Sequence, residues 1–213
     1  MDHTHAADDA DRYASFDERA ATWDDDPAKV ARAQQVAATI KDAVPLDQQT
    51  RLLEYGAGTG LVSEALRDAV GPLTLADTSA GMRAVMERKA GSGALRGARI
   101  WDIDLSSAPA PAGEQFDMVV TAMTLHHIAD LEPVLAAFAG LLRPGGHLCI
   151  ADLEEEDGSF HGEGFHGHHG FRRDELERLL VGAGFGDVSF RACGHVDRGG
   201  APFPVFLATA TRR

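Results

Sequence analysis

From residue 51 onward, short apolar runs alternate with segments that have a helical period. The runs are continuous rather than alternately polar, as expected of strands covered on both faces in a parallel sheet. Helices are predicted between them, near 60–70, 80–90 and 130–142. This strand–helix alternation predicts a doubly wound α/β fold with three α/β/α layers. The five predicted strands are 51–55, 72–77, 98–104, 116–123 and 146–153.

The last third of the chain departs from this alternation. A predicted helix at 171–183 precedes two apolar runs, 186–194 and 203–213, with no helix between them. Strands that follow each other directly pair most simply in antiparallel fashion. We therefore expect a seven-stranded, mostly parallel sheet whose last strand is antiparallel, with the final pair at the sheet edge.

The N-terminal part of the chain is predicted to be helical. Its aromatic and small residues Tyr13, Phe16, Ala20 and Trp23 are spaced by three and four and share one helical face. Pro27 then opens a second helix that runs through Val44. We divide the chain into a helical lid or cover (1–45) and a ligand-binding domain (46–213). The shared face of Tyr13, Phe16, Ala20 and Trp23 has two interpretations. It either packs the helix against the core of the domain or closes over a bound ligand.

Charge and composition narrow the class of protein. The formal net charge is −13, which repels phosphate backbones and anionic lipid. We therefore expect no nucleic-acid and no membrane partner. No apolar stretch approaches the roughly 20 residues that a membrane span needs, and the start of the chain does not resemble a signal peptide. A cytoplasmic location is expected. Cys149 and Cys193 lie in separate apolar runs and are interpreted as buried thiols.

A glycine-rich loop joins the first predicted strand to the helix that follows it. Gly56, Gly58 and Gly60 let the backbone turn sharply and approach a ligand closely. A tight turn without a ligand would have the same composition. The dinucleotide fingerprint GxGxxG does not fit, because Leu61 and Ser63 occupy the positions where its third small residue would stand.

Acidic residues end two successive predicted strands. Asp77 follows the second strand, where a carboxylate can accept both hydroxyls of a ribose. Asp102 and Asp104 end the third, where a carboxylate can accept a hydrogen bond from an exocyclic amine. Each alone could be a capping residue. Their joint placement at one sheet edge favours a nucleoside site.

These motifs resemble the class I S-adenosylmethionine-dependent methyltransferases. The similarity lies in EYGAGTG (54–60), ADTSAGM (76–82), FDMVVTAMTLHHI (116–128) and LLRPGGHL (141–148). FDERAATWDDD also resembles the opening of the small-molecule branch that includes quinone-biosynthesis methyltransferases. The resemblance implies S-adenosylmethionine as cofactor, with its ribose at Asp77 and its adenine beside Met82. The exocyclic amino group of the adenine would lie near Asp102 or Asp104. The resemblance further implies cofactor contacts by Glu54, Gly56, Ala57, Gly58, Gly60 and Ala122.

Two adjacent histidines, His126 and His127, follow the fourth predicted strand directly. This strand end belongs to the edge where ligands bind in such sheets. Side chains of neighbouring residues point in different directions in regular structure, so we expect one ring to face the pocket and the other to pack under the next helix. Either histidine is a candidate catalytic residue, and a structural role is the alternative.

The segment 154–171 is rich in glycine, phenylalanine and histidine and leaves the fifth strand at the same edge. We interpret it as an acceptor loop that closes over a substrate and excludes water. A solvated surface loop and a metal site formed by its histidines and acidic residues are the alternatives; we expect no metal. The candidate substrate contacts are Phe160, His161, Phe165, His168 and Trp23. The candidate catalytic residues, besides the adjacent pair, are His166, His169 and Tyr13.

Taken together, these patterns predict transfer of a methyl group from S-adenosylmethionine to a small-molecule oxygen, nitrogen or sulfur atom. S-adenosylhomocysteine would be the second product. A noncatalytic binding domain and an NAD(P)-dependent oxidoreductase are the alternatives. We expect a monomer or a homodimer.

Overall fold

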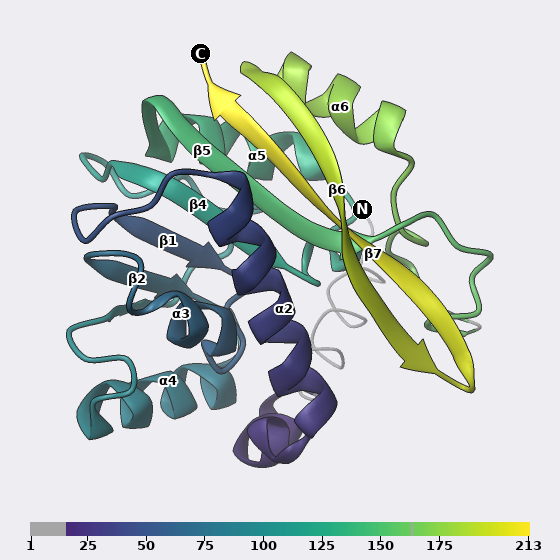
Figure 1. The fold of residues 1–213 in the computed structure, drawn as a ribbon, viewed down its shortest axis with the longest axis horizontal. Helices are drawn as coiled ribbons and strands as arrows, with labels where there is room; N and C mark the ends of the chain where they lie inside the picture. Colours follow the sequence, from purple (N-terminus) through teal and green to yellow (C-terminus); the bar gives the residue numbers. More distant parts are fainter. Residues whose placement is uncertain (1–15, 163) are drawn as a thin grey trace, which may run out of the picture.

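The computed structural model describes residues 16–162 and 164–213, which form one seven-stranded sheet with helices on both faces (Figure 1). The strand order is β3-β2-β1-β4-β5-β7-β6. Strands β1 to β5 pair in parallel, and β7 is antiparallel to both β5 and β6. The predicted fold class is therefore confirmed. The strands are β1 (Leu52–Tyr55), β2 (Leu73–Ala76), β3 (Arg99–Trp101), β4 (Phe116–Ala122), β5 (Leu142–Leu153), β6 (Phe185–Arg198) and β7 (Ala201–Arg212).

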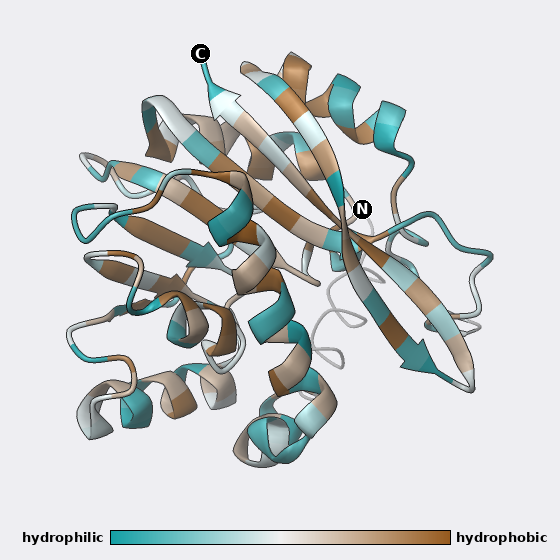
Figure 2. Cartoon of the chain, in the orientation of Figure 1, coloured by the Kyte–Doolittle hydropathy of each residue, from teal (hydrophilic) through white to brown (hydrophobic). Residues whose placement is uncertain are grey.

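Two hydrophobic cores lie on opposite faces of this sheet. Consecutive strand residues supply them alternately, so Leu52 belongs to the core that contains α2 and α3, and Leu53 to the core that contains α5 and α6. Apolar residues accordingly dominate the central strands in Figure 2. The described helices and 3₁₀ turns are η1 (Ala20–Asp25), α2 (Pro27–Ala43), α3 (Leu61–Leu66), α4 (Ala80–Ser92), η2 (Leu125–His127), α5 (Leu131–Leu141) and α6 (Arg173–Gly182).

Helix starts follow from local sequence. At α2, the Asp26 carboxylate accepts a hydrogen bond from the Ala28 amide at 2.9 Å, and Pro27 supplies a backbone angle suited to the first turn. At α4, the Ser79 hydroxyl accepts from the Met82 amide at 3.1 Å. None of the helices in the described ranges is long and apolar enough to cross a bilayer.

The final two strands form an antiparallel pair at the sheet edge, as predicted. Strand β7 inserts between β5 and β6, so only β6 lies at the edge. The reason is burial: β7 is nearly continuously buried in its second half, whereas β6 alternates with exposed residues as an edge strand does. The far end of this hairpin extends past the sheet and packs on the segment 154–171, where the Phe160 and Phe203 rings lie 5.1 Å apart.

The strand order reverses between β1 and β4, which are neighbours in the sheet. Chain connections leave the carboxyl ends of these two strands in opposite directions, which is where ligands bind in sheets of this kind. The glycine loop follows β1 and the adjacent histidines follow β4. The fold thus brings both predicted motifs to the same edge of the sheet.

Candidate functional site

The glycine loop after β1 presents open backbone at its middle. Gly58 has a φ of +57°, and a Cβ atom placed there would meet nothing within 4 Å. At Gly56, a Cβ atom would instead overlap the Thr124 side chain. The open position is therefore at Gly58, where a ligand can lie directly against the loop.

Asp77, directly after β2, is hydrogen-bonded to this loop. Its Oδ2 accepts from the Gly58 amide at 2.7 Å, and its Oδ1 accepts from the Ser79 amide at 2.8 Å. Burial raises the pKa of the carboxyl, and these two N–H groups oppose that effect. Each oxygen keeps a second lone pair for a ligand hydroxyl.

Glu54 is buried in β1, directly under the loop. Its Oε2 accepts from the Ser63 amide at 2.9 Å and from the Ser63 hydroxyl. Burial raises the pKa of the Glu54 carboxyl to about 7, against the effect of the Ser63 hydrogen bonds. A carboxyl with this pKa changes charge near neutral pH.

This raised pKa predicts a pH-dependent stability. Between the ordinary pKa of 4.5 and about 7, the folded carboxyl holds a proton that the unfolded chain has released. The free energy of unfolding should therefore fall as pH rises through this window, by about 3 kcal/mol. Urea unfolding of Glu54→Gln, compared with the parent at pH 4.5, 6 and 7.5, measures the effect. An equal pH slope in both proteins would contradict it.

The two carboxylates after β3 lie outside the strand, which ends at Trp101 and not at the predicted 104. Asp102 pairs with Arg83 at 2.9 Å and is otherwise well exposed. Asp104 accepts a hydrogen bond within its own turn, from the Ser106 amide at 2.9 Å, and another from the Tyr55 hydroxyl at the end of β1, at 3.4 Å. The strand stops early because this turn satisfies the backbone locally. Which of the two contacts an adenine stays a prediction.

The segment that precedes α2 is hydrogen-bonded to the glycine loop. The Asp24 carboxylate accepts from the Thr59 hydroxyl at 2.5 Å and also pairs with Lys89. The Asp17 carboxylate accepts from the Gly81 amide at 2.8 Å and from the Ser79 hydroxyl at 2.5 Å. Sequence reasoning missed both aspartates, although both lie in the FDERAATWDDD motif.

The aromatic residues of this segment face the same region. Phe16 packs with Trp23 at 5.9 Å and contacts the His127 ring edge to face at 5.7 Å. Met82 is buried beside them, together with Ala20. Trp23 also lies over the Lys29 ammonium at 3.9 Å. Tyr13, the predicted catalytic residue of the lid, lies outside the described residues.

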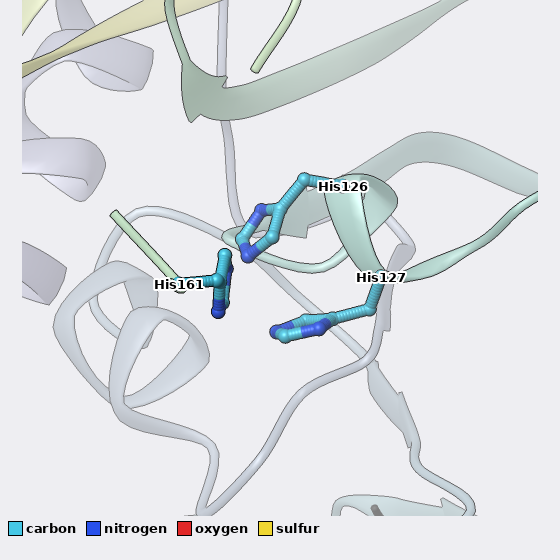
Figure 3. Close-up of side chains that lie close together, drawn as sticks. All are labelled: His126, His127 and His161. Carbon is cyan, nitrogen blue, oxygen red and sulfur yellow. The ribbon is translucent and has the colours of Figure 1, made fainter. Parts of the chain in front are cut away.

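Three histidine rings converge beyond the loop (Figure 3). His126 and His127 lie in η2, and His161 comes from the segment 154–171; their ring centroids are 4.2 to 5.2 Å apart. The expectation that the adjacent pair would diverge is wrong. It applied the geometry of regular structure to a three-residue turn, in which both rings can incline toward His161.

A buried carboxylate that the sequence analysis did not single out orients one of these rings. Asp152, at the end of β5, is fully buried, and its Oδ1 lies 2.5 Å from His126 Nδ1. Since a carboxylate carries no proton to donate, Nδ1 is the protonated nitrogen and Nε2 is left for a ligand. The sequence signal was an acidic residue ending a strand, as with Asp77.

The other residues of the histidine-rich segment 154–171 differ in how closely they contact the cluster. Phe165 stacks on His161 at 3.7 Å, and the His168 amide donates to the His126 carbonyl at 2.8 Å. His169 bonds to Glu156 at 3.1 Å, and His166 is exposed. Burial, and next the neighbouring His126, lower the pKa of His161 to about 4, so its ring is neutral at pH 7. Of the four predicted loop histidines, the structure brings His161 into the cluster.

The histidine cluster lies next to the glycine loop. Thr124, two residues before His126, donates from its hydroxyl to the Gly56 carbonyl at 3.2 Å and to the Ala122 carbonyl at 3.1 Å. Met123 between them has a φ of +55°, a conformation that turns the chain sharply after β4. A molecule lying on the loop would therefore have the imidazoles at one end.

This arrangement agrees with comparison to known proteins. Residues 53–150 match the family model described as a methyltransferase domain. The matched residues run from β1 through most of β5 and contain the glycine loop, Asp77 and the adjacent histidines. Residues 53–150 are a methyltransferase domain, and the fold is that of the class I methyltransferases. The cofactor of this family is S-adenosylmethionine, as the resemblance implied.

Individual relatives support the assignment to methyltransferases but do not identify the acceptor that is methylated. The chain is 35% identical over 149 residues to the biotin biosynthesis bifunctional protein BioCD of Bordetella avium, covering 69% of this chain and 29% of that protein. The chain thus spans less than a third of this relative.

Solved structures show the same fold at lower identity. A methyltransferase in complex with the Haloferax volcanii Trm112 activator has a TM-score of 0.74 and 18% identity, covering 92% of this chain and 96% of that one. Haemonchus contortus phosphoethanolamine N-methyltransferase 2, solved with S-adenosylhomocysteine and phosphomonomethylethanolamine, has a TM-score of 0.70 and 15% identity, covering 84% and 52%.

Proposed function

We propose that the methyltransferase transfers a methyl group from S-adenosylmethionine to a small-molecule nucleophile bound beside His126, His127 and His161. The observation that carries this proposal is the contact of Thr124 with Gly56. This contact holds the histidine cluster against the glycine loop, which is the cofactor loop of the proposal. The products are the methylated acceptor, S-adenosylhomocysteine and the proton that the acceptor gives up.

The cofactor side of the site suits a nucleoside with a charged amino-acid tail. Gly58 leaves room for close approach, and Asp77 offers both of its oxygens to the hydroxyls of a ribose. Buried Glu54 can meet an ammonium group by releasing its proton, which its raised pKa allows near neutral pH. When bound, S-adenosylmethionine supplies a methyl group on a positively charged sulfur, which is a good leaving group.

On the acceptor side, the main task of the protein is to hold the acceptor in line with the methyl group. The rings of Phe165, His161 and Phe16 surround His127 and can hold a small aromatic or heteroaromatic acceptor in line with the methyl group. Proximity and orientation of this kind can supply several kcal/mol of rate acceleration. Asp152 holds His126 so that Nε2 faces the cluster, where it can receive the proton of the acceptor or bind a cation.

The segment 16–26 acts in this proposal as the lid. Asp17 accepts a hydrogen bond from the start of α4, and Asp24 accepts one from the cofactor loop. Phe16 contacts the ring of His127. Closure would bury the reacting atoms and exclude water. The loop 154–171 covers the opposite side.

Methyl transfer from labelled S-adenosylmethionine into fractions of a metabolite extract tests the function. Label should enter a small molecule when the parent protein is present, with Asp77→Ala as the negative control. A protein that binds S-adenosylhomocysteine but labels nothing would be a noncatalytic binding domain. Stabilisation by NAD alone would instead indicate an oxidoreductase.

Substitution of single carboxylates separates their roles. We expect Asp77→Asn to weaken binding of S-adenosylhomocysteine at least about tenfold, because an amide cannot accept both ribose hydroxyls while keeping the Gly58 and Ser79 contacts. Calorimetric titration measures the affinity. Asp102→Asn and Asp104→Asn are the matched variants, and the one that weakens binding identifies the adenine partner. Unchanged affinity in Asp77→Asn would contradict the ribose assignment.

A further inference from the structure

The three converging imidazoles have the composition and spacing of a metal site. His126, His127 and His161 each offer one ring nitrogen, and these nitrogens all lie within 4.8 Å of one another. Figure 3 shows them approaching from η2 and from the loop, with one nitrogen of His126 facing His161. In a tetrahedral zinc site the ligand nitrogens are about 3.4 Å apart. Inward movements of about 1 Å would therefore complete the coordination.

The surroundings of His126 match those of a metal-ligating histidine. Such histidines usually donate their second ring N–H to a carboxylate, which fixes the tautomer and the ring orientation. Asp152 does this here at 2.5 Å while also accepting from the Leu153 amide at 2.8 Å. The carboxylate is thus rigid, and it directs Nε2 of His126 toward the other two rings.

A second observation points to a missing ligand. His161 Nε2 is buried and makes no hydrogen bond within the described ranges 16–162 and 164–213. Leaving a buried polar atom unpaired costs about 1–3 kcal/mol, so such atoms usually have a partner. Phe165 stacks flat on the His161 ring and prevents it from turning freely to solvent. Coordination of a cation at the cluster would remove this cost.

We propose that His126, His127 and His161 bind one divalent transition-metal ion, for which Zn²⁺ is the best chemical match. Neutral imidazoles suit zinc and related ions, and three protein ligands leave a coordination position open. Because Thr124 holds the cluster against the cofactor loop, a heteroatom of the acceptor could occupy that position. Asp152 is the positioning residue of the site.

The ligand set differs from the one that the sequence suggested as its metal alternative. That set drew on the loop histidines His161, His166, His168 and His169, whereas the structure combines only His161 with the pair after β4. Glycines flank His161, with Gly158 and Gly162 at φ values of +91° and +84°, and give this segment the freedom to draw His161 inward. The inference concerns binding of a metal and does not depend on methyl transfer.

Metal titration of the full chain tests the inference. Tag-free protein with His3→Ala and His5→Ala, which remove two histidines outside the described residues, is stripped with a chelator. It is then titrated with Co²⁺, read by visible absorption, and with Zn²⁺, read by calorimetry. We expect one ion per chain and intense absorption bands of a low-coordinate cobalt site.

Variants decide whether the cluster is the site. His161→Ala should weaken Zn²⁺ binding at least about tenfold, and Asp152→Asn should weaken it about 10- to 100-fold. His195→Ala, at an exposed histidine of β6, is the matched control and should bind like the parent. Titration with S-adenosylhomocysteine shows that each variant is folded and that the cofactor site persists.

Two results would overturn the inference. They are no stoichiometric binding of Zn²⁺ or Co²⁺ by the parent, and equal affinity in folded His161→Ala. In either case, retained binding of S-adenosylhomocysteine and retained methyl transfer would leave the proposed function intact. Failure of cofactor binding in the parent would reject the proposed function instead.

Discussion

Replacing Asp152 by alanine is expected to lower the free energy of unfolding by about 3 kcal/mol or more and to abolish methyl transfer. Asp152 is fully buried and accepts from three N–H groups, those of the His126 ring, the His126 amide and the Leu153 amide. Without the carboxylate, these donors remain buried and unpaired, and each lost partner costs about 1–3 kcal/mol. Urea unfolding measures the stability, and transfer of labelled methyl measures the activity.

An exposed pair of the same chemistry supplies the control. On β6, Asp197 lies 3.5 Å from His195, and both side chains are more than half exposed. Asp197→Ala should therefore change stability little, because water replaces the carboxylate. Asp152→Asn keeps the side-chain volume and separates packing from charge. If Asp152→Ala were no more destabilising than Asp197→Ala, the buried pair would have no structural importance.

The elements that could be predicted from sequence are those set by local pattern. Continuous apolar runs become strands because both of their faces are covered, as the alternating assignment of Leu52 and Leu53 to two cores shows. The helix starts at Pro27 and Ala80 follow from capping by Asp26 and Ser79. The glycine loop was likewise recognisable, since its composition and its place after a strand are both local.

The histidine cluster was only half predictable, because it depends on contacts between distant segments. The acceptor loop could be named from its composition, but the selection of His161 results from its packing against Phe165 and Phe160, and Phe160 in turn packs on Phe203 of β7. Nothing in the sequence alone orders His161, His166 and His169 by distance to His126.

Acidic residues were the least predictable part of the site. An Asp in a strongly acidic chain usually lies on a solvated surface, and a sequence pattern does not identify those that meet a donor. Asp17 and Asp24 find their donors in Ser79, Gly81 and Thr59, which follow other strands. The lid is thus held by tertiary hydrogen bonds, while its amphipathic spacing alone left core packing and closure equally open.

Gly58→Ala is expected to weaken binding of S-adenosylhomocysteine at least about tenfold while costing only about 1–2 kcal/mol of stability. The left-handed backbone conformation at Gly58 penalises any Cβ atom by about 1–2 kcal/mol. The added methyl group clashes with nothing in the protein itself, since no heavy atom lies within 4 Å. It would, however, occupy the space in which the cofactor approaches the loop. Calorimetric titration and urea unfolding give the two quantities separately.

Gly113→Ala provides the comparison that isolates the ligand. Gly113 has a φ of +80°, an added Cβ atom would also meet nothing within 4 Å, and it lies in the turn before β4, at the opposite edge of the sheet. Both variants should therefore lose similar stability, but only Gly58→Ala should lose cofactor affinity. Equal affinities would mean that the open face of the loop does not receive the cofactor. An affinity loss at Gly58 much larger than its stability loss would place the ligand at the loop, either directly against the Gly58 backbone or on Asp77, which the Gly58 amide holds.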